Sequence, residues 1–162
     1  MKDFPQLNGF KKSPGLVRLI GHRGARGLMP ENTIEGFEFT LNQGVTALEF
    51  DVLMSKDNIP VITHDNLLSK ASTRDDKGKW LVKEGPQISE LTLSELKQFD
   101  VGGINANSSY GKSFPEQKFL SGIRIPTLSE LLNLACLPKY KSLYLLLEVK
   151  SEPSLNKANI VK

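Results

Sequence analysis

The stretch VTALEFDVLM, residues 45–54, decides the fold. Its pattern is that of a β-strand, in which the apolar residues at even positions from 48 to 52 share one face and Glu49 and Asp51 lie on the other. A carboxylate in a buried strand costs free energy unless something compensates its charge. Two explanations stay open. The pair could meet arginine or lysine at the rim of a sheet, or it could bind Mg²⁺ or Ca²⁺, because oxygen ligands at positions i and i+2 can converge on one hard cation.

A hairpin is expected to bring a histidine back toward these carboxylates. Turn-forming residues at 55–58 precede a third strand expected at residues 59–63. The connection is too short to hold a crossover helix, so the two strands should be antiparallel. If the chain turns at 55–58, residues whose numbers sum to about 113 face each other, which places His64 opposite Glu49; a slip of one or two residues stays open.

Two more strands are expected to end at the same rim. The apolar run at residues 16–20 indicates a buried strand that ends at His22, and the run at residues 143–149 indicates a buried strand that carries Glu148 near its end. The carboxyl ends of neighbouring strands meet at one edge of a sheet. We therefore expect both histidines and all three carboxylates to converge there.

The residue types at this rim suit acid–base chemistry on a phosphate. Histidine occurs twice in the chain, as His22 and His64. One such residue alone would usually be structural, but neutral imidazoles near pH 7 can together take a proton from a nucleophile and give one to a leaving group. Arg23 and Lys150 would add positive charge where a phosphate needs neutralising. The alternative, in which these two cations form ion pairs with the carboxylates, stays open.

Helix signals lie between the expected strands. Asn32 begins a capping-box-like pattern, and Gly44 is the expected stop of that helix. Two further capping boxes occupy residues 92–95 and 127–130, whereas the Gly, Asn and Ser residues at 102–111 predict a loop. Strands alternating with helices, with polar residues at the strand ends, predict an α/β fold of the TIM (β/α)8-barrel type.

Chain length limits how much of such a barrel can be present. A complete barrel needs about 250 residues, and this chain has 162. We therefore expect one partial domain over residues 1–162, equivalent to the N-terminal part of the barrel, with a small insertion at about residues 65–122. An incomplete barrel would expose sheet edges and an apolar interior, so the missing half is expected from a longer chain or from a second copy in a homo-oligomer.

Composition excludes several other classes of protein. The net charge of +3 is weak and evenly spread, which argues against a nucleic-acid partner. No apolar run approaches the roughly 20 residues of a membrane span. Residues 1–14 lack the apolar core of a secretory signal, and the single cysteine, Cys136, is expected to be buried in a helix. These features predict a cytoplasmic location.

Five motifs, in order, resemble those of the glycerophosphodiester phosphodiesterase family. They are GHRGA at residues 21–25 with PENT at 30–33, EFDV at 49–52, PVITHD at 60–65, IPTLSE at 125–130 and LEVK at 147–150. The resemblance implies a TIM barrel that hydrolyses a small-molecule glycerophosphodiester to sn-glycerol 3-phosphate and an alcohol. It assigns a divalent cation, Mg²⁺ or Ca²⁺, to Glu49, Asp51 and Glu148, acid–base roles to His22 and His64, and phosphate contacts to Arg23 and Lys150.

The resemblance also implies that the insertion covers the barrel mouth and contributes to substrate selection. Trp80, Phe99 or Tyr110 could line that mouth, although packing roles are the commoner fate of aromatic residues. Two alternative functions stay open. One is a truncated fragment that binds phosphate or metal without turnover. The other is an activity on choline lipids like that of related phospholipase D toxins, which are secreted, disulfide-bearing proteins.

Overall fold

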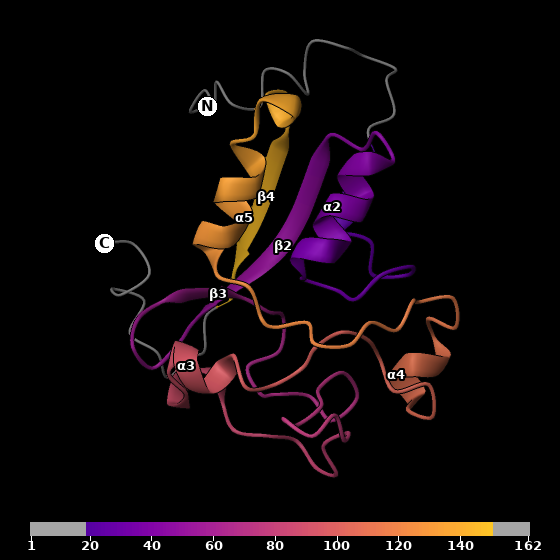
Figure 1. Ribbon diagram of the computed structural model, residues 1–162, viewed down its shortest axis with the longest axis vertical. Helices are drawn as coiled ribbons and strands as arrows, with labels where there is room; N and C mark the ends of the chain where they lie inside the picture. Colours follow the sequence, from indigo (N-terminus) through magenta and orange to yellow (C-terminus); the bar gives the residue numbers. More distant parts are fainter. Residues whose placement is uncertain (1–18, 151–162) are drawn as a thin grey trace, which may run out of the picture.

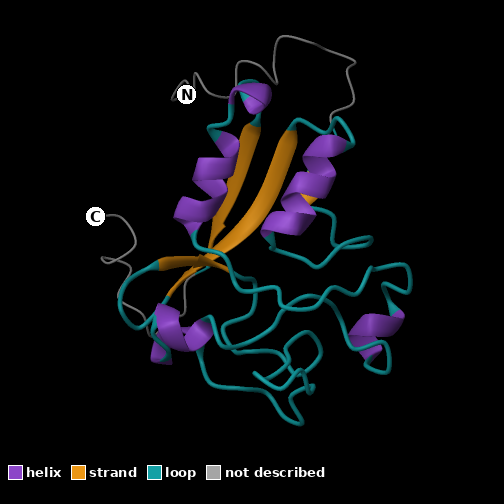
Figure 2. Ribbon diagram, viewed as in Figure 1, coloured by secondary structure: helices purple, strands orange, loops and turns teal. Residues whose placement is uncertain are grey.

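The computed structural model describes residues 19–150 and shows a four-stranded sheet with helices against it and a long irregular segment at one end (Figures 1 and 2). Strand β2 lies at the centre, and each of the other three described strands pairs with it. In chain order the elements are β1 (Gly21–His22), α2 (Ile34–Asn42), β2 (Ala47–Met54), β3 (Pro60–Ile62), η2 (Ile88–Glu90), α3 (Leu93–Leu96), α4 (Ser109–Lys112), α5 (Leu128–Ala135), η3 (Pro138–Tyr140) and β4 (Tyr144–Val149).

Two of the partners of β2 run parallel to it, as a barrel sheet requires. Strand β1 pairs with the first half of β2 and brings His22 beside Glu49. Strand β4 pairs with β2 along its whole length and brings Glu148 beside Asp51. The carboxyl ends of all three strands therefore lie at one edge of the sheet, as the sequence predicts.

Strand β3 forms the expected hairpin with β2, but the register differs by one residue. Met54 pairs with Pro60, so the loop between them contains residues 55–59 instead of the four turn residues expected from the sequence. Because the loop is one residue longer, every partner across the hairpin shifts by one. The observed register is a slip of one residue, which the sequence left open, so His64 is not opposite Glu49 in the register of this ladder.

The apolar face of β2 packs against both long helices. Figure 1 shows α2 and α5 flanking β2 and β4. The core between them is made of buried residues from both helices and from the sheet: Phe37, Leu41, Leu48, Phe50, Val52, Ile62, Leu131 and Leu134. Burying these side chains contributes most of the free energy that holds the sheet to its helices. The alternation predicted for β2 is confirmed, and its other face carries Glu49 and Asp51.

Helix caps follow the sequence closely, with one correction. Helix α2 is capped by Thr33, whose hydroxyl accepts the Gly36 N–H at 3.1 Å, and not by Asn32. The Asn32 backbone has φ of +54°, and its side chain turns to Asp51 instead. Gly44 follows the helix with φ of +83°, a conformation that suits glycine. Both later capping boxes, at α3 and α5, are confirmed.

The segment from 65 to 122 has little regular structure but has its own core. Its buried apolar residues pack with Leu53, Val61 and Ile125, and the remaining members of this cluster are Leu68, Ile88 and Leu96. Phe99 packs against the same cluster, and Trp80 meets Phe119 edge to face. Both aromatic residues therefore have the packing roles that the sequence made the commoner expectation.

A buried ion pair ties the two ends of this segment together. The Arg74 guanidinium donates to the Asp100 carboxylate at 2.9 Å and to the Leu120 carbonyl at 2.6 Å. The two oxygens of Asp100 also accept the backbone N–H groups of Gly102 and Gly122, at 2.9 and 2.7 Å. The Arg74 guanidinium in addition lies 4.0 Å from the centre of the Phe119 ring.

Several details of the sequence expectations are wrong. Leu19 and Ile20 are exposed and precede β1, whereas residues 1–18, including most of the expected first strand and the N-terminal stretch, lie outside the described residues. Strand β4 is half-buried in its first half and exposed in its second half, since β2 is its pairing partner within residues 19–150. Cys136 is exposed at the end of α5. The expected loop at 102–111 contains the start of α4, capped by Ser108. No helix within residues 19–150 is long and apolar enough to cross a membrane.

Candidate active site

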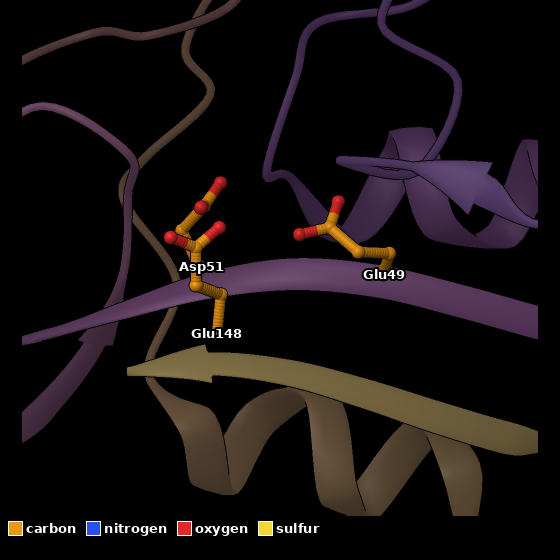
Figure 3. Close-up of side chains that lie close together, drawn as sticks. All are labelled: Glu49, Asp51 and Glu148. Atoms are coloured by element: carbon orange, nitrogen blue, oxygen red, sulfur yellow. The ribbon is translucent and has the colours of Figure 1, made fainter. Parts of the chain in front are cut away.

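Three carboxylates converge at the carboxyl end of the parallel strands. Glu49 and Asp51 project from the same face of β2, and the Glu148 side chain reaches from β4 to the side of Asp51 (Figure 3). One oxygen of each residue lies within 4.8 Å of the others. Asp51 is buried, with 1% of its side chain exposed, whereas Glu148 is 57% exposed. The cluster is therefore open to solvent on the β4 side and closed on the β2 side.

Two cations balance this negative charge. The Lys150 ammonium bridges Asp51, at 3.1 Å, and Glu148, at 2.6 Å. Burial works to lower the pKa of Lys150, but the hydrogen bonds to these two carboxylates raise it above its ordinary value. The ion-pair arrangement that the sequence left open for Lys150 is thus the one seen in the structure.

Arg23 occupies the other side of the cluster. Its guanidinium donates to Glu31 at 2.8 Å, and its Nε lies 3.4 Å from Asp51 without making a hydrogen bond among the described residues. Its backbone N–H donates to Glu49 at 3.0 Å. Burial works to lower the pKa of the guanidinium, but the hydrogen bond and charge of Glu31 raise it.

Asn32 fixes the orientation of the buried carboxylate. Its side-chain amide donates to Asp51 at 3.0 Å, and the residue is 4% exposed. Asn32 and Arg23 both have positive φ, at +54° and +51°. Non-glycine residues reach this conformation at a cost, and such residues gather at functional sites. The loop between β1 and α2 is therefore shaped to bring two polar side chains onto Asp51.

The two histidines reach the site from different strands and have different partners. His22, on β1, places its Nε2 3.8 Å from Glu49. His64, two residues beyond the end of β3, places its Nδ1 2.6 Å from Asp65. His64 and Lys150 help to line one open pocket of about 500 Å³, so His64 faces the same mouth as the bridging ammonium. The structure thus gathers the expected residues, although His64 arrives by a different register.

A model of the glycerophosphoryl diester phosphodiesterase family matches residues 22–160 of the chain. The chain belongs to this family. Across 137 residues it is 36% identical to a candidate glycerophosphodiester phosphodiesterase of Bacillus subtilis, covering 84% of this chain and 46% of that protein. Taken with its parallel sheet, this membership identifies the α/β fold as the N-terminal part of a TIM barrel.

Solved structures of family members superimpose on the chain. A candidate glycerophosphoryl diester phosphodiesterase from Silicibacter pomeroyi is 51% identical with a TM-score of 0.90, over 97% of this chain and 53% of that one. An Oleispira antarctica phosphodiesterase, solved in complex with the product sn-glycerol-3-phosphate, is 35% identical with a TM-score of 0.58, over 83% of this chain and 45% of that one. The chain spans about half the length of these family members.

The carboxylate cluster has the donor chemistry of a hard-cation site. All three side chains offer oxygen, which is the ligand type that Mg²⁺ and Ca²⁺ prefer. The three carboxylates face two cationic side chains, Arg23 and Lys150, so the cluster keeps a net negative charge that favours a divalent cation. Glu49, Asp51 and Glu148 therefore fit the cofactor that the family resemblance implies.

Four functional-looking residues were missed or misread in the sequence. Glu31 and Asn32 lie within the PENT motif, where the sequence had indicated only a helix start, and Asp65 directly follows His64. Tyr110 packs on Phe114 as expected, but its hydroxyl in addition donates to Glu31. Burial first, and then the charge of Glu31, raise the pKa of Tyr110 to about 12. The quoted motifs at residues 30–33 and 60–65 contain Glu31, Asn32 and Asp65 and could have signalled their roles, whereas Tyr110 lies in none of the motifs.

Proposed function

We propose that the chain is the N-terminal part of a metal-dependent enzyme that hydrolyses glycerophosphodiesters to sn-glycerol 3-phosphate and an alcohol. The observation that carries this proposal is the convergence of Glu49, Asp51 and Glu148 between two cationic side chains. A cluster of this kind can hold a metal and a phosphate side by side. The bound product of the Oleispira antarctica phosphodiesterase supports the choice of substrate.

The three carboxylates would hold the divalent cation. When bound, it would polarise a phosphate oxygen and offset the charge that develops on the phosphoryl group. Asn32 donates to one oxygen of Asp51, which holds the carboxylate in place. This arrangement supports either Mg²⁺ or Ca²⁺ as the cofactor.

Arg23 and Lys150 would bind the phosphate. Each lies beside Asp51 and carries a charge that its surroundings stabilise. The Nε of Arg23 lies 3.4 Å from Asp51 and makes no hydrogen bond among residues 19–150, so this donor is not committed to a carboxylate and could turn to a phosphate oxygen. The ammonium of Lys150 can exchange its contact with Glu148 for a phosphate, because Glu148 is largely exposed.

The two histidines would move the protons. The Asp65 carboxylate can only accept, so the proton of a neutral His64 lies on Nδ1 and leaves Nε2 free to accept another. This tautomer supports His64 as the base that deprotonates the attacking oxygen, from a substrate hydroxyl or from water. His22 would then protonate the leaving alcohol.

A metal-dependence assay tests the proposal. We expect release of sn-glycerol 3-phosphate from glycerophosphocholine with Mg²⁺ or Ca²⁺, and none with excess chelator. Asp51→Asn, which removes one ligand charge without changing side-chain volume, should abolish the stimulation by metal. Asp76→Asn, which makes the same change at an exposed position of the insertion, should leave it intact.

The same samples separate turnover from binding. A metal that binds the folded chain raises its melting temperature by mass action, so a thermal melt with and without Mg²⁺ reports the site even without catalysis. A metal-dependent shift without turnover would favour the alternative of a non-catalytic metal- and phosphate-binding fragment, which the half-length match to the relatives makes relevant. If metal causes no shift in melting temperature and the chain shows no turnover, the proposed site is contradicted.

A further inference from the structure

Residues on and just after α4, within the inserted segment, contact the loop between β1 and α2. The side-chain amide of Gln117 donates to the Arg26 carbonyl at 2.7 Å, and the Lys118 N–H donates to the Leu28 carbonyl at 2.9 Å. The Arg26 guanidinium lies 4.8 Å from the centre of the Phe114 ring. We call Tyr110, Phe114, Gln117 and Lys118 the α4 clamp, because the four residues together hold the loop that carries Arg23.

Tyr110 of the α4 clamp is connected to Arg23 through one residue, Glu31. The Tyr110 hydroxyl donates to Oε2 of Glu31, while Oε1 of the same carboxylate accepts from Arg23 at 2.8 Å. Tyr110 and Glu31 are 79 positions apart in the sequence, so the contact forms only when the insertion is docked. A carboxylate held at both oxygens has one orientation, and it imposes that orientation on the guanidinium.

Arg23 depends on such support more than an ordinary arginine does. Its backbone has φ of +51°, which is unfavourable for a residue with a side chain. The long side chain also loses rotamer entropy when it is fixed. Its Nε makes no hydrogen bond among the described residues and has only the ion-pair contact with Asp51 at 3.4 Å, so the hydrogen bond to Glu31 is the one that fixes the direction of the guanidinium.

From this chain of contacts we propose that Tyr110 is a positioning residue, which orients Arg23 toward the substrate phosphate by fixing the carboxylate of Glu31. This inference rests on the proposed function, since it takes the phosphate role of Arg23 from there. If Tyr110 has this role, the docked insertion contributes to phosphate binding as well as to any covering of the barrel mouth. Because the pKa of Tyr110 is raised to about 12, its hydroxyl remains a donor throughout the neutral range.

Removal of the hydroxyl alone tests the proposal. Tyr110→Phe keeps the ring that packs edge to face on Phe114 at 5.2 Å and removes the hydroxyl, which donates to Glu31 and also contacts the Arg26 side chain. We expect KM for glycerophosphocholine, and Kd for inorganic phosphate, to rise together by about 10-fold, which corresponds to losing one hydrogen bond to a charged group, with kcat little changed. Partial unfolding would instead lower kcat and leave KM as it was. Tyr140→Phe, which removes a hydroxyl at the opposite end of β4, is the matched control and should change neither constant.

Two further measurements test the route through Glu31. Glu31→Gln should raise KM at least as much as Tyr110→Phe, and the double variant should be no worse than Glu31→Gln alone, because both changes act through one carboxylate. Additive losses would overturn the proposal. In ¹⁵N NMR spectra, the Nε–H signal of Arg23, assigned by its absence from Arg23→Lys, should exchange faster with solvent in Tyr110→Phe than in the unsubstituted chain.

The NMR measurement also separates this inference from the proposed function. If the chain neither binds phosphate nor turns over substrate but the Arg23 signal changes in Tyr110→Phe, the positioning contact stands and the proposed function fails. If the chain is active while the Arg23 signal and KM are unchanged in Tyr110→Phe, the positioning role fails and the proposed function stands.

Discussion

Replacing His64 with alanine will lower the turnover number for glycerophosphodiesters by about 10²–10⁴-fold, the range typical of a lost general acid or base. The imidazole faces the same mouth as Lys150, and the Asp65 carboxylate leaves its Nε2 free to accept a proton. His22→Ala should cause a loss of similar size, because the scheme needs both a proton acceptor and a donor. Steady-state release of sn-glycerol 3-phosphate at saturating substrate measures both effects.

The exposure of His22 and His64 makes their alanine variants easy to interpret. Both are solvent-accessible, with 53% of His22 and 32% of His64 exposed, so neither substitution removes core packing. Thermal melts of the two variants should therefore match that of the unsubstituted chain. Asp65→Asn is a graded control, since it keeps the volume of the side chain but weakens the orientation of the His64 ring. Turnover close to the original rate in either alanine variant would rule out the two-histidine scheme.

Replacing Asp100 with alanine will destabilise the chain by about 3–5 kcal/mol, the cost of leaving one member of a buried ion pair unpaired. Arg74 and Asp100 are 3% and 4% exposed, so water cannot replace the lost carboxylate. The change also removes the acceptor of the backbone N–H groups of Gly102 and Gly122. Urea unfolding followed by circular dichroism measures the loss, which is large against the ordinary stability of about 5–15 kcal/mol for a domain.

Two comparison variants, Asp100→Asn and Glu84→Ala, test whether burial causes the loss of stability expected in Asp100→Ala. Asp100→Asn retains one oxygen acceptor and should lose less free energy than Asp100→Ala. Glu84→Ala removes an exposed carboxylate that pairs with the Lys70 ammonium and accepts the Lys70 backbone N–H. Both side chains are about half exposed, so water can replace these contacts, and the free energy of unfolding should change by less than about 1 kcal/mol. Similar losses in Asp100→Ala and Glu84→Ala would show that burial does not set the strength of the Arg74 contact.

Local patterns made much of the fold and the carboxylate cluster predictable. The alternation of β2 identified its two faces, and the two capping boxes identified the starts of α3 and α5, because each signal lies within a few consecutive residues. The carboxylates at 49, 51 and 148 could be placed together because parallel strands align their ends. These are properties of secondary structure and sheet geometry that do not depend on the rest of the molecule.

Features that depend on loop length or on distant contacts could not be predicted in this way. The hairpin register changed because the loop contains five residues where the turn signal suggested four. Asparagine is a common helix-capping residue, but Thr33 caps this helix because the Asn32 side chain donates a hydrogen bond to the buried Asp51 instead. The contact between Tyr110 and Glu31 has no local signal, since 79 positions separate the two residues.

The pairing of β2 with β4 has a consequence for the order in which the molecule is built. Asp51 and Glu148 are neighbours in the sheet, although the whole insertion is synthesised between them. Contacts at such long range form late, because the intervening chain must first be closed into a loop. A nascent chain on the ribosome therefore displays Glu49 and Asp51 long before the third carboxylate joins them. We expect tight cation binding to begin only when β4 docks, so that the ion stabilises the completed sheet and not its precursors.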